Sequence, residues 1–284
     1  NLISKCPSNF SFLLGMSNAP KIGWSSPFVI GSFIGAALLL GFFIWWELRV
    51  SVPMLDLGFF KLSTFSIGVI LRFTAFMGMS AVRYLMPFYF QSILGYSARY
   101  FGLIAIPASL CTIIVAPLSG QLSDRFGWKK FAVGGLITMV AGLILLSAIS
   151  VQTSLLFVIA AWVLQFIGHG TFTAPNNASV LSVVPQERFG VVSSFVNMIR
   201  NAGNVTGTAL TTAIITSVLI ARGLPPTLES ASSAADAGLA QAFTTGMKIA
   251  YIVPAALMAI GLLLYPMVKR RRKPAASQTP VAPA

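Results

Sequence analysis

The chain has 284 residues, of which 56% are hydrophobic and only 9% are charged, with a formal net charge of +13. Soluble domains average about 25% charged residues, so this composition excludes a water-soluble globule, and its hydrophobicity excludes a disordered chain. The mean hydropathy of +0.84 and the presence of only two cysteines, too few for a disulfide-stapled secreted fold, leave an integral membrane protein.

Apolar segments long enough to cross a membrane follow one another along the chain. A helix needs about 20 mostly apolar residues to cross the hydrocarbon core, and unbroken apolar segments favour helices over the alternating pattern of a β-barrel. We therefore expect an all-α integral membrane protein with about seven transmembrane helices. In chain order these spans are Phe28–Trp46, Phe65–Phe90, Ala98–Ser119, Phe131–Ile149, Leu155–Ala174, Gly190–Ala221 and Met247–Val268.

The connecting segments differ in positive charge. If the C-terminus is cytoplasmic, the inside segments hold eleven of the nineteen Lys and Arg residues, and the outside segments, to which Lys248 is assigned, hold five. The positive-inside rule favours this orientation, in the plasma (inner) membrane. Because most of the basic residues lie between spans or in one terminal cluster, and not on one face, nucleic acid is not an expected partner. Residues 222–244 form the long outside loop in this prediction.

The beginning of the chain is unusual for a membrane protein with an outside N-terminus. It starts with Asn1 instead of Met, and residues 1–27 would be extracytoplasmic without a signal peptide to carry them across. We expect a piece of a longer protein, with further spans upstream. At the other end, residues 269–284 predict a basic, disordered cytoplasmic tail.

Three spans carry polar or charged residues at helical spacing, although such residues are costly in hydrocarbon. A polar face of this kind predicts a route for a small-molecule substrate. Gly203 and Gly207 lie on a neighbouring face of the sixth span and predict close helix packing. The residues expected to line the substrate pathway are Arg72, Phe76, Gln165, His169, Asn197, Arg200 and Asn204.

Two of these residues have alternative interpretations. Arg200 lies about ten residues into its span, where an arginine costs about 3 kcal/mol, so it either bonds to carbonyls of a broken helix or serves a solvated pathway or gate. His169, the single histidine, is either a proton carrier or a hydrogen-bonded spacer between helices. All six acidic residues fall in loops or at span ends, so the buried charges are positive. They favour an anionic or amphiphilic ligand unless acids outside this chain neutralise them.

The segment between the third and fourth spans reads GQLSDRFGWKK and is expected to be a loop. Gly127 suits a turn, and Asp124 can cap the following helix or hold an arginine. Framed by two spans, the segment resembles the G-x-L-x-D-R-x-G-x-K-K signature of the major facilitator superfamily. The resemblance implies a cytoplasmic gate loop formed by Gly120, Asp124, Arg125, Gly127, Lys129 and Lys130.

Two more segments narrow the resemblance to one branch. Residues 53–65 resemble the P-M-L-D-L-x-x-F-x-x-x-x-F linker of the fourteen-helix multidrug:proton antiporters (EmrB/QacA-like), and residues 175–207 are similar to that branch's penultimate two-helix region. The resemblance implies an extra helix with a cytoplasmic linker over residues 28–63 and the C-terminal six-helix bundle over residues 64–268.

The resemblance implies multidrug or small-amphiphile efflux by proton-coupled alternating access. Its expected partners are membrane lipid, a small-molecule substrate, protons, and an N-terminal bundle in the same or another chain; no cofactor is expected. The alternative is a truncated, non-transporting membrane protein or a scaffold subunit. An enzyme is not expected, because the sequence holds no G-x-S-x-G motif and no metal-ligand cluster.

Overall fold

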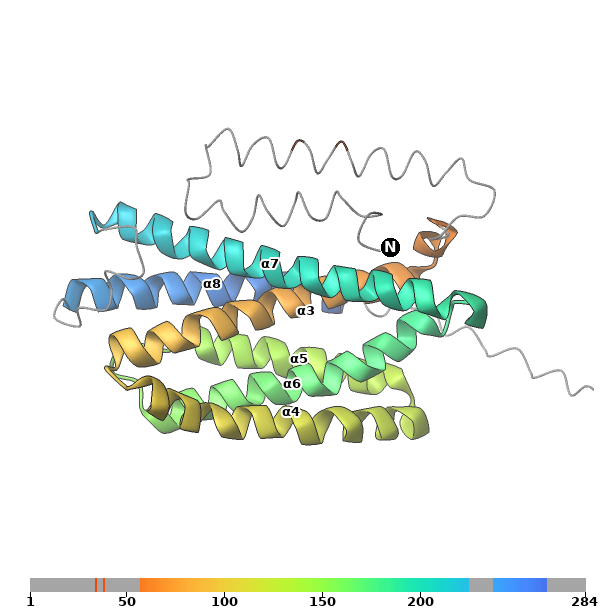
Figure 1. Ribbon diagram of the computed structural model, residues 1–284, viewed down its shortest axis with the longest axis horizontal. Helices are drawn as coiled ribbons and strands as arrows, with labels where there is room; N and C mark the ends of the chain where they lie inside the picture. The colour runs from red at the N-terminus through yellow and green to blue at the C-terminus, as the bar shows by residue number, and fades with distance from the viewer. Residues whose placement is uncertain (1–33, 35–37, 39–56, 225–236, 265–284) are drawn as a thin grey trace, which may run out of the picture.

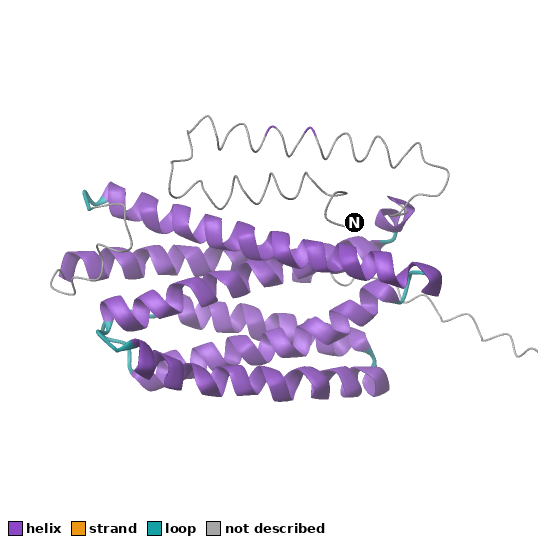
Figure 2. Ribbon diagram, viewed as in Figure 1, coloured by secondary structure: helices purple, strands orange, loops and turns teal. Residues whose placement is uncertain are grey.

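A computed structural model describes Ile34, Leu38 and residues 57–224 and 237–264. All regular structure in this part of the chain is helical (Figure 2). The elements are the 3₁₀ helix η2 (Leu57–Lys61), α3 (Ser63–Phe88), the π-helical η3 (Tyr89–Ile93), α4 (Ala98–Phe126), α5 (Trp128–Ser147), α6 (Leu155–Leu181), η4 (Gln186–Arg188), α7 (Phe189–Ala221) and α8 (Ala237–Leu264).

Six helical segments in the described ranges are long and apolar enough to cross a membrane. They coincide with six of the seven predicted spans, so the all-α membrane fold is confirmed. The predicted first span, Phe28–Trp46, lies outside the described residues apart from two positions. The predicted segments 1–27 and 269–284 also lie outside them.

The helices run side by side along the long axis of the molecule, and α6 holds a central place (Figure 1). It packs against α5, α4 and α3, while α8 packs against α5, α3 and α7. α3 also packs along α7, so α3 lies between α6 and α7 on the face turned toward the viewer. α4 contacts mainly α6, and most of its large apolar side chains are exposed, as expected for a helix that meets lipid or another bundle.

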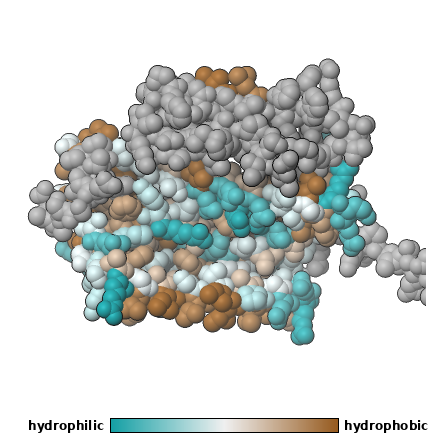
Figure 3. All heavy atoms as spheres, viewed as in Figure 1, coloured by the Kyte–Doolittle hydropathy of each residue, from teal (hydrophilic) through white to brown (hydrophobic). Residues whose placement is uncertain are grey.

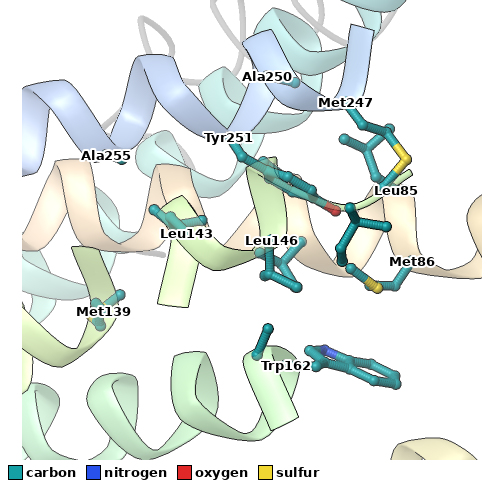
Figure 4. Close-up of a cluster of buried hydrophobic side chains, with 14 of the residues drawn as sticks. Leu85, Met86, Met139, Leu143, Leu146, Trp162, Met247, Ala250, Tyr251 and Ala255 are labelled. Atoms are coloured by element: carbon teal, nitrogen blue, oxygen red, sulfur yellow. The ribbon is translucent and has the colours of Figure 1, made fainter. Parts of the chain in front are cut away.

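The main core joins α3, α5, α6 and α8. The ring of Tyr251 on α8 is fully buried among Leu85 and Met86 of α3 and Leu146 of α5 (Figure 4). A second, smaller cluster lies at the start of α3, where Phe65 packs with the end of α6 and the beginning of α7. The two clusters fix α3 to its neighbours near both of its ends.

Glycines bring helix backbones into direct contact. A Cβ on Gly135 of α5 would lie 2.6 Å from the amide nitrogen of Phe172 on α6, and one on Gly203 of α7 would lie 2.6 Å from the carbonyl oxygen of Phe73 on α3. Gly207 is equally close to the α3 backbone at Met77. Lipid tails are as apolar as leucine, so such backbone packing is a main source of helix association. The predicted close packing at Gly203 and Gly207 is confirmed.

The predicted loop between α4 and α5 is wrong in extent. α4 continues to Phe126 and α5 begins at Trp128, so only Gly127, with φ of 93°, interrupts the helices. Asp124 lies within α4, and no side chain caps α5, so the predicted capping role is also wrong. The reason is that charged residues mark the end of an apolar segment but do not stop a helix. The backbone hydrogen bonds of the helix continue past the hydrocarbon core into the polar headgroup region.

Two other predicted boundaries differ for the same reason. α8 begins at Ala237, so residues 237–244, predicted as loop, are helical, and Lys248 lies inside α8 instead of in a connecting segment. α6 continues seven residues past the predicted end at Ala174, with Pro175 inside it. Membrane helices tolerate such a proline because neighbouring groups satisfy the freed backbone.

Candidate functional site

Three predicted site residues meet between α3 and α6. The guanidinium carbon of Arg72 lies 5.4 Å from the centroid of the Phe76 ring, within the roughly 6 Å range of a cation–π contact. The imidazole of His169 meets the same ring edge to face, with centroids 4.8 Å apart and planes at 84°. Helical spacing places Arg72 one turn from Phe76 on α3, and His169 lies at the middle of α6. The structure thus brings these residues into one cluster.

Arg72 and His169 are buried but not sealed, with 5% and 6% of their surfaces exposed. Nε and Nη1 of Arg72 and Nδ1 of His169 are buried without a hydrogen-bond partner. Buried polar atoms are nearly always satisfied, and unpaired ones commonly mark a site where a ligand binds. The cluster therefore holds three buried nitrogen atoms that no group of the described residues satisfies.

α7 adds polar residues beside this cluster. Arg200 is half-buried, and its positive charge repels that of Arg72 across the α3–α7 interface. Asn204, one turn further along α7, is also half-buried, and its side-chain oxygen has no partner. Asn197 is exposed. Only two carboxylates, Asp124 and Glu187, occur among residues 57–224 and 237–264; both are exposed and lie at helix ends, so the charge of the site itself is positive.

Gln165 lies apart from the cluster. It is fully buried where α6 meets α5, and its amide oxygen would lie 2.8 Å from a Cβ on Gly142. Both of its amide atoms lack partners. Asn176, a further member of the polar face of α6, donates a hydrogen bond of 3.3 Å from Nδ2 to the carbonyl oxygen of Gly68 and so joins α6 to α3.

The surface beside the cluster is hydrophilic. Figure 3 shows hydrophilic residues gathered in a band between α7 and α4, with hydrophobic residues along α4. Arg83, Asn197 and Asn201 are exposed polar residues of α3 and α7. A polar band beside apolar helices is the arrangement expected of a half-cavity that contacts water.

The predicted gate residues lie at the junction of α4 and α5. Asp124 and Arg125 are exposed on the last turn of α4, and Gly120 is half-buried, with its carbonyl accepting a bond of 2.8 Å from Ser123. Lys129 and Lys130 belong to the first turn of α5, on the other side of Gly127. The gating role of these residues stays a prediction.

Trp162, which the helical spacing of α6 places on the face of His169, belongs to an aromatic cluster whose other members were not predicted from the sequence. Trp162 of α6 stacks on Phe101 of α4, with centroids 5.7 Å apart, and meets Phe90 at 6.0 Å. Phe166, one turn along α6, contacts the edge of Trp162 at 6.0 Å. Aromatic residues within apolar spans resemble lipid-facing ones in sequence. The available signal was the spacing of Trp162 and Phe166 at seven and three residues before His169, which places all three on one face of α6.

Comparisons with known proteins give consistent matches. The family described as Major Facilitator Superfamily matches residues 8–208 and, in a second alignment, residues 68–284. Lincomycin resistance protein LmrB of Listeria monocytogenes is 27% identical over 260 residues, covering 92% of this chain and 54% of the relative. Multidrug resistance protein Stp of Mycobacterium tuberculosis is 30% identical over 214 residues, covering 75% of this chain and 39% of the relative.

The fold has a counterpart among solved structures. It is similar to a bacterial homolog of the human lysosomal transporter Spinster, in an inward-facing and occupied conformation, with a TM-score of 0.55 and 19% identity. That match covers 93% of this chain and 64% of the other. The chain spans about half the length of the curated relatives it matches, 54% of LmrB and 39% of Stp.

Proposed function

We infer that this chain, which belongs to the Major Facilitator Superfamily, provides one half of a transporter that moves small amphiphilic molecules across a membrane. It is a multi-pass membrane protein. The observation that carries the proposal is the contact of Arg72, Phe76 and His169 at the middle of membrane-length helices. A packing role needs neither an unpaired guanidinium nor an unpaired imidazole, and both are costly in hydrocarbon.

The direction of transport in this proposal is drug efflux. Two similar proteins are named for lincomycin resistance and multidrug resistance. The linker over residues 53–65 resembles that of the fourteen-helix multidrug:proton antiporters. In this assignment residues 64–268 are the C-terminal bundle, residues 28–63 are the extra helix and its linker, and an N-terminal bundle in the same or another chain completes the cavity.

The proposed mechanism is alternating access between two bundles. α3, α6 and α7 form this chain's wall of the cavity, with Arg72, His169, Asn197, Arg200 and Asn204 facing the substrate. At the cytoplasmic end, Gly120, Asp124 and Arg125 hold the gate closed, and opening breaks their contacts with the other bundle. Protons supply the driving force. Among the residues described, His169 is the group in the spans whose ordinary titration range is near neutral pH, so acids of the other bundle would assist it.

Dye efflux tests this function. Inverted membrane vesicles that contain the full transporter with this chain should expel a lipophilic dye when energised, and a protonophore should stop the efflux. Arg200→Ala should slow efflux by about tenfold, the effect of one lost charge-assisted contact. The matched control is Arg222→Ala, because Arg222 is exposed and bonds to Thr245 at the far end of α7. Efflux in the Arg200→Ala variant at the wild-type rate and equal expression would remove Arg200 from the pathway.

A second candidate function is a scaffold subunit that does not transport. In this candidate the chain, which covers 54% of LmrB, acts without the rest of that length. The DNA upstream of the Asn1 codon distinguishes the two candidates. An in-frame region that encodes six further spans supports the transporter, whereas a start codon next to Asn1, with no dye efflux upon expression, supports the scaffold.

A further inference from the structure

We propose that Arg72 and His169, both in contact with Phe76 between α3 and α6, bind the anionic group of an amphiphilic ligand. The proposal rests on the proposed function only in placing this cluster on the substrate pathway. It deepens that function by naming the chemical class of the ligand.

The first argument is the missing counter-charge of Arg72. An arginine is always protonated in proteins, so burial cannot be relieved by loss of a proton. Only 5% of the surface of Arg72 is exposed, and its Nε and Nη1 have no hydrogen-bond partner. Neither carboxylate of the described ranges, Asp124 or Glu187, is near it; both are exposed at helix ends. A buried, unpaired charge is strongly destabilising, so the cluster as these helices build it favours an anion.

The second argument is how the guanidinium is held. The face of the Phe76 ring supports Arg72 by a cation–π contact, which leaves the in-plane N–H groups free. Those N–H groups match two oxygens of a carboxylate, sulfonate or phosphate group in a bidentate pair. His169, fixed against the edge of the same ring, brings its unpaired Nδ1 to the cluster. Helix packing therefore sets the guanidinium of α3 and the imidazole of α6 in place before a ligand arrives.

The third argument concerns the rest of the ligand. Arg200 adds a second positive charge near Arg72, which favours an anion and opposes a cation. On α6, half-buried Phe166 lies one turn from His169 on the same face and contacts Trp162. Phe166, which is partly exposed, is the residue that we expect to contact the apolar body of a ligand whose anionic head lies at Arg72. The class that fits is an organic anion with a planar, apolar part.

A set of probes that share a naphthyl group and differ in the charge of the side chain tests the proposal. The probes are radiolabelled naphthylacetate, its neutral isostere naphthylacetamide, and the cation naphthylethylammonium. Binding to the full chain is measured by scintillation proximity in nanodiscs of phosphatidylcholine. We expect naphthylacetate to bind about tenfold or more tightly than the other two probes, the effect of one charge-assisted pair.

Matched variants locate the charge that causes the preference. Arg72→Gln should bring the affinities of naphthylacetate and naphthylacetamide to within about twofold, while Arg72→Lys should keep a preference for the anion. Arg99→Gln removes an equal charge at the exposed start of α4 and should change nothing. Unchanged naphthylacetamide binding and a single size-exclusion peak show that Arg72→Gln has folded.

Each outcome supports or overturns the site. Equal binding of the three probes, or an undiminished preference for the anion in folded Arg72→Gln, overturns it. If Arg72→Gln does not fold, the binding of the probes to Arg72→Lys is compared with their binding to the wild type. An equal loss of binding for all three probes in Arg72→Lys overturns the site.

Adding phosphatidylglycerol to the nanodiscs distinguishes two sources of the same anionic chemistry. Competition of this lipid with naphthylacetate assigns the site to a lipid headgroup, and unchanged naphthylacetate binding assigns it to a solute. Dye efflux together with equal binding of charged and neutral probes would support the transport function and overturn this site.

Discussion

Three consecutive residues of α6 each meet a different helix. A Cβ on Gly168 would lie 2.6 Å from the amide nitrogen of Met139 on α5, His169 meets Phe76 of α3, and Gly170 faces Ala116 of α4 at 3.4 Å. The carbonyl of Gly170 also accepts a bond of 3.1 Å from Ser119 of α4. Because the residues on both sides of His169 are held by other helices, its imidazole has a fixed position relative to Phe76.

The Ser119 bond gives a prediction with a control on the same helix. Ser119→Ala should lower the free energy of unfolding by about 0.6 kcal/mol, the average for a hydrogen bond between membrane helices. Ser109→Ala should leave it unchanged, because its hydroxyl bonds only within α4, to Ala105, and is exposed. Thermal unfolding in detergent measures both. Equal melting temperatures for the two variants would show that the bond to Gly170 adds no stability.

At the scale of the helix, apolar length predicts the existence and order of the elements, but not their ends. The spans from Phe65 to Ala221 each fall on an observed helix, since hydrocarbon requires both an apolar sequence and satisfied backbone groups. The ends of α4, α6 and α8 lie outside the apolar segments, where charged and small residues still form helix. Hydropathy does not distinguish these residues from loops.

The candidate site was predictable only in part, because periodicity gives the face of a helix but not its neighbour. The spacing places Arg72 and Phe76 on one face of α3, and the structure shows that this face meets His169. The same reasoning places Gln165 with His169, yet Gln165 packs against Gly142 of α5. Contacts between α3 and α6 depend on how glycines let helices approach, which a single sequence does not reveal.

Two adjacent glycines of α5 test that dependence on close approach. Gly135→Ala should destabilise the protein by about 1–3 kcal/mol, since its Cβ would overlap the backbone of α6 at Phe172. Gly134→Ala should instead be neutral or stabilising by up to about 1 kcal/mol, because nothing lies within 4 Å of its Cβ and alanine favours helix. The midpoint of thermal unfolding reports the difference. A Gly135→Ala variant as stable as Gly134→Ala would mean that α5 and α6 pack less tightly than described.

At the scale of the whole molecule, the alternation of helices fixes which connections share a side of the membrane. The α4–α5 junction and the C-terminal end of α7 lie at opposite ends of the bundle (Figure 1). With a cytoplasmic C-terminus, Lys130 lies inside and Arg222 outside, and both are exposed. This orientation is the one that the basic residues favour.

Cysteine labelling tests the orientation. In a background with Cys6→Ser and Cys111→Ser, Arg222→Cys should react with a membrane-impermeant maleimide in intact cells. Lys130→Cys should react only after the membrane is permeabilised. The reverse labelling pattern would show the opposite orientation in the membrane, with the positive residues of the α4–α5 junction outside.

The single residue between α4 and α5 has a mechanical consequence. Because Gly127 alone joins the two helices, the end of α4 cannot swing away without pulling α5 with it. The backbone of α5 is in turn packed closely against that of α6 at Gly135 and Gly168. We therefore expect α4, α5 and α6 to move together as one rigid unit. Inserting a few flexible residues at Gly127 would loosen the connection and let α4 move separately from α5.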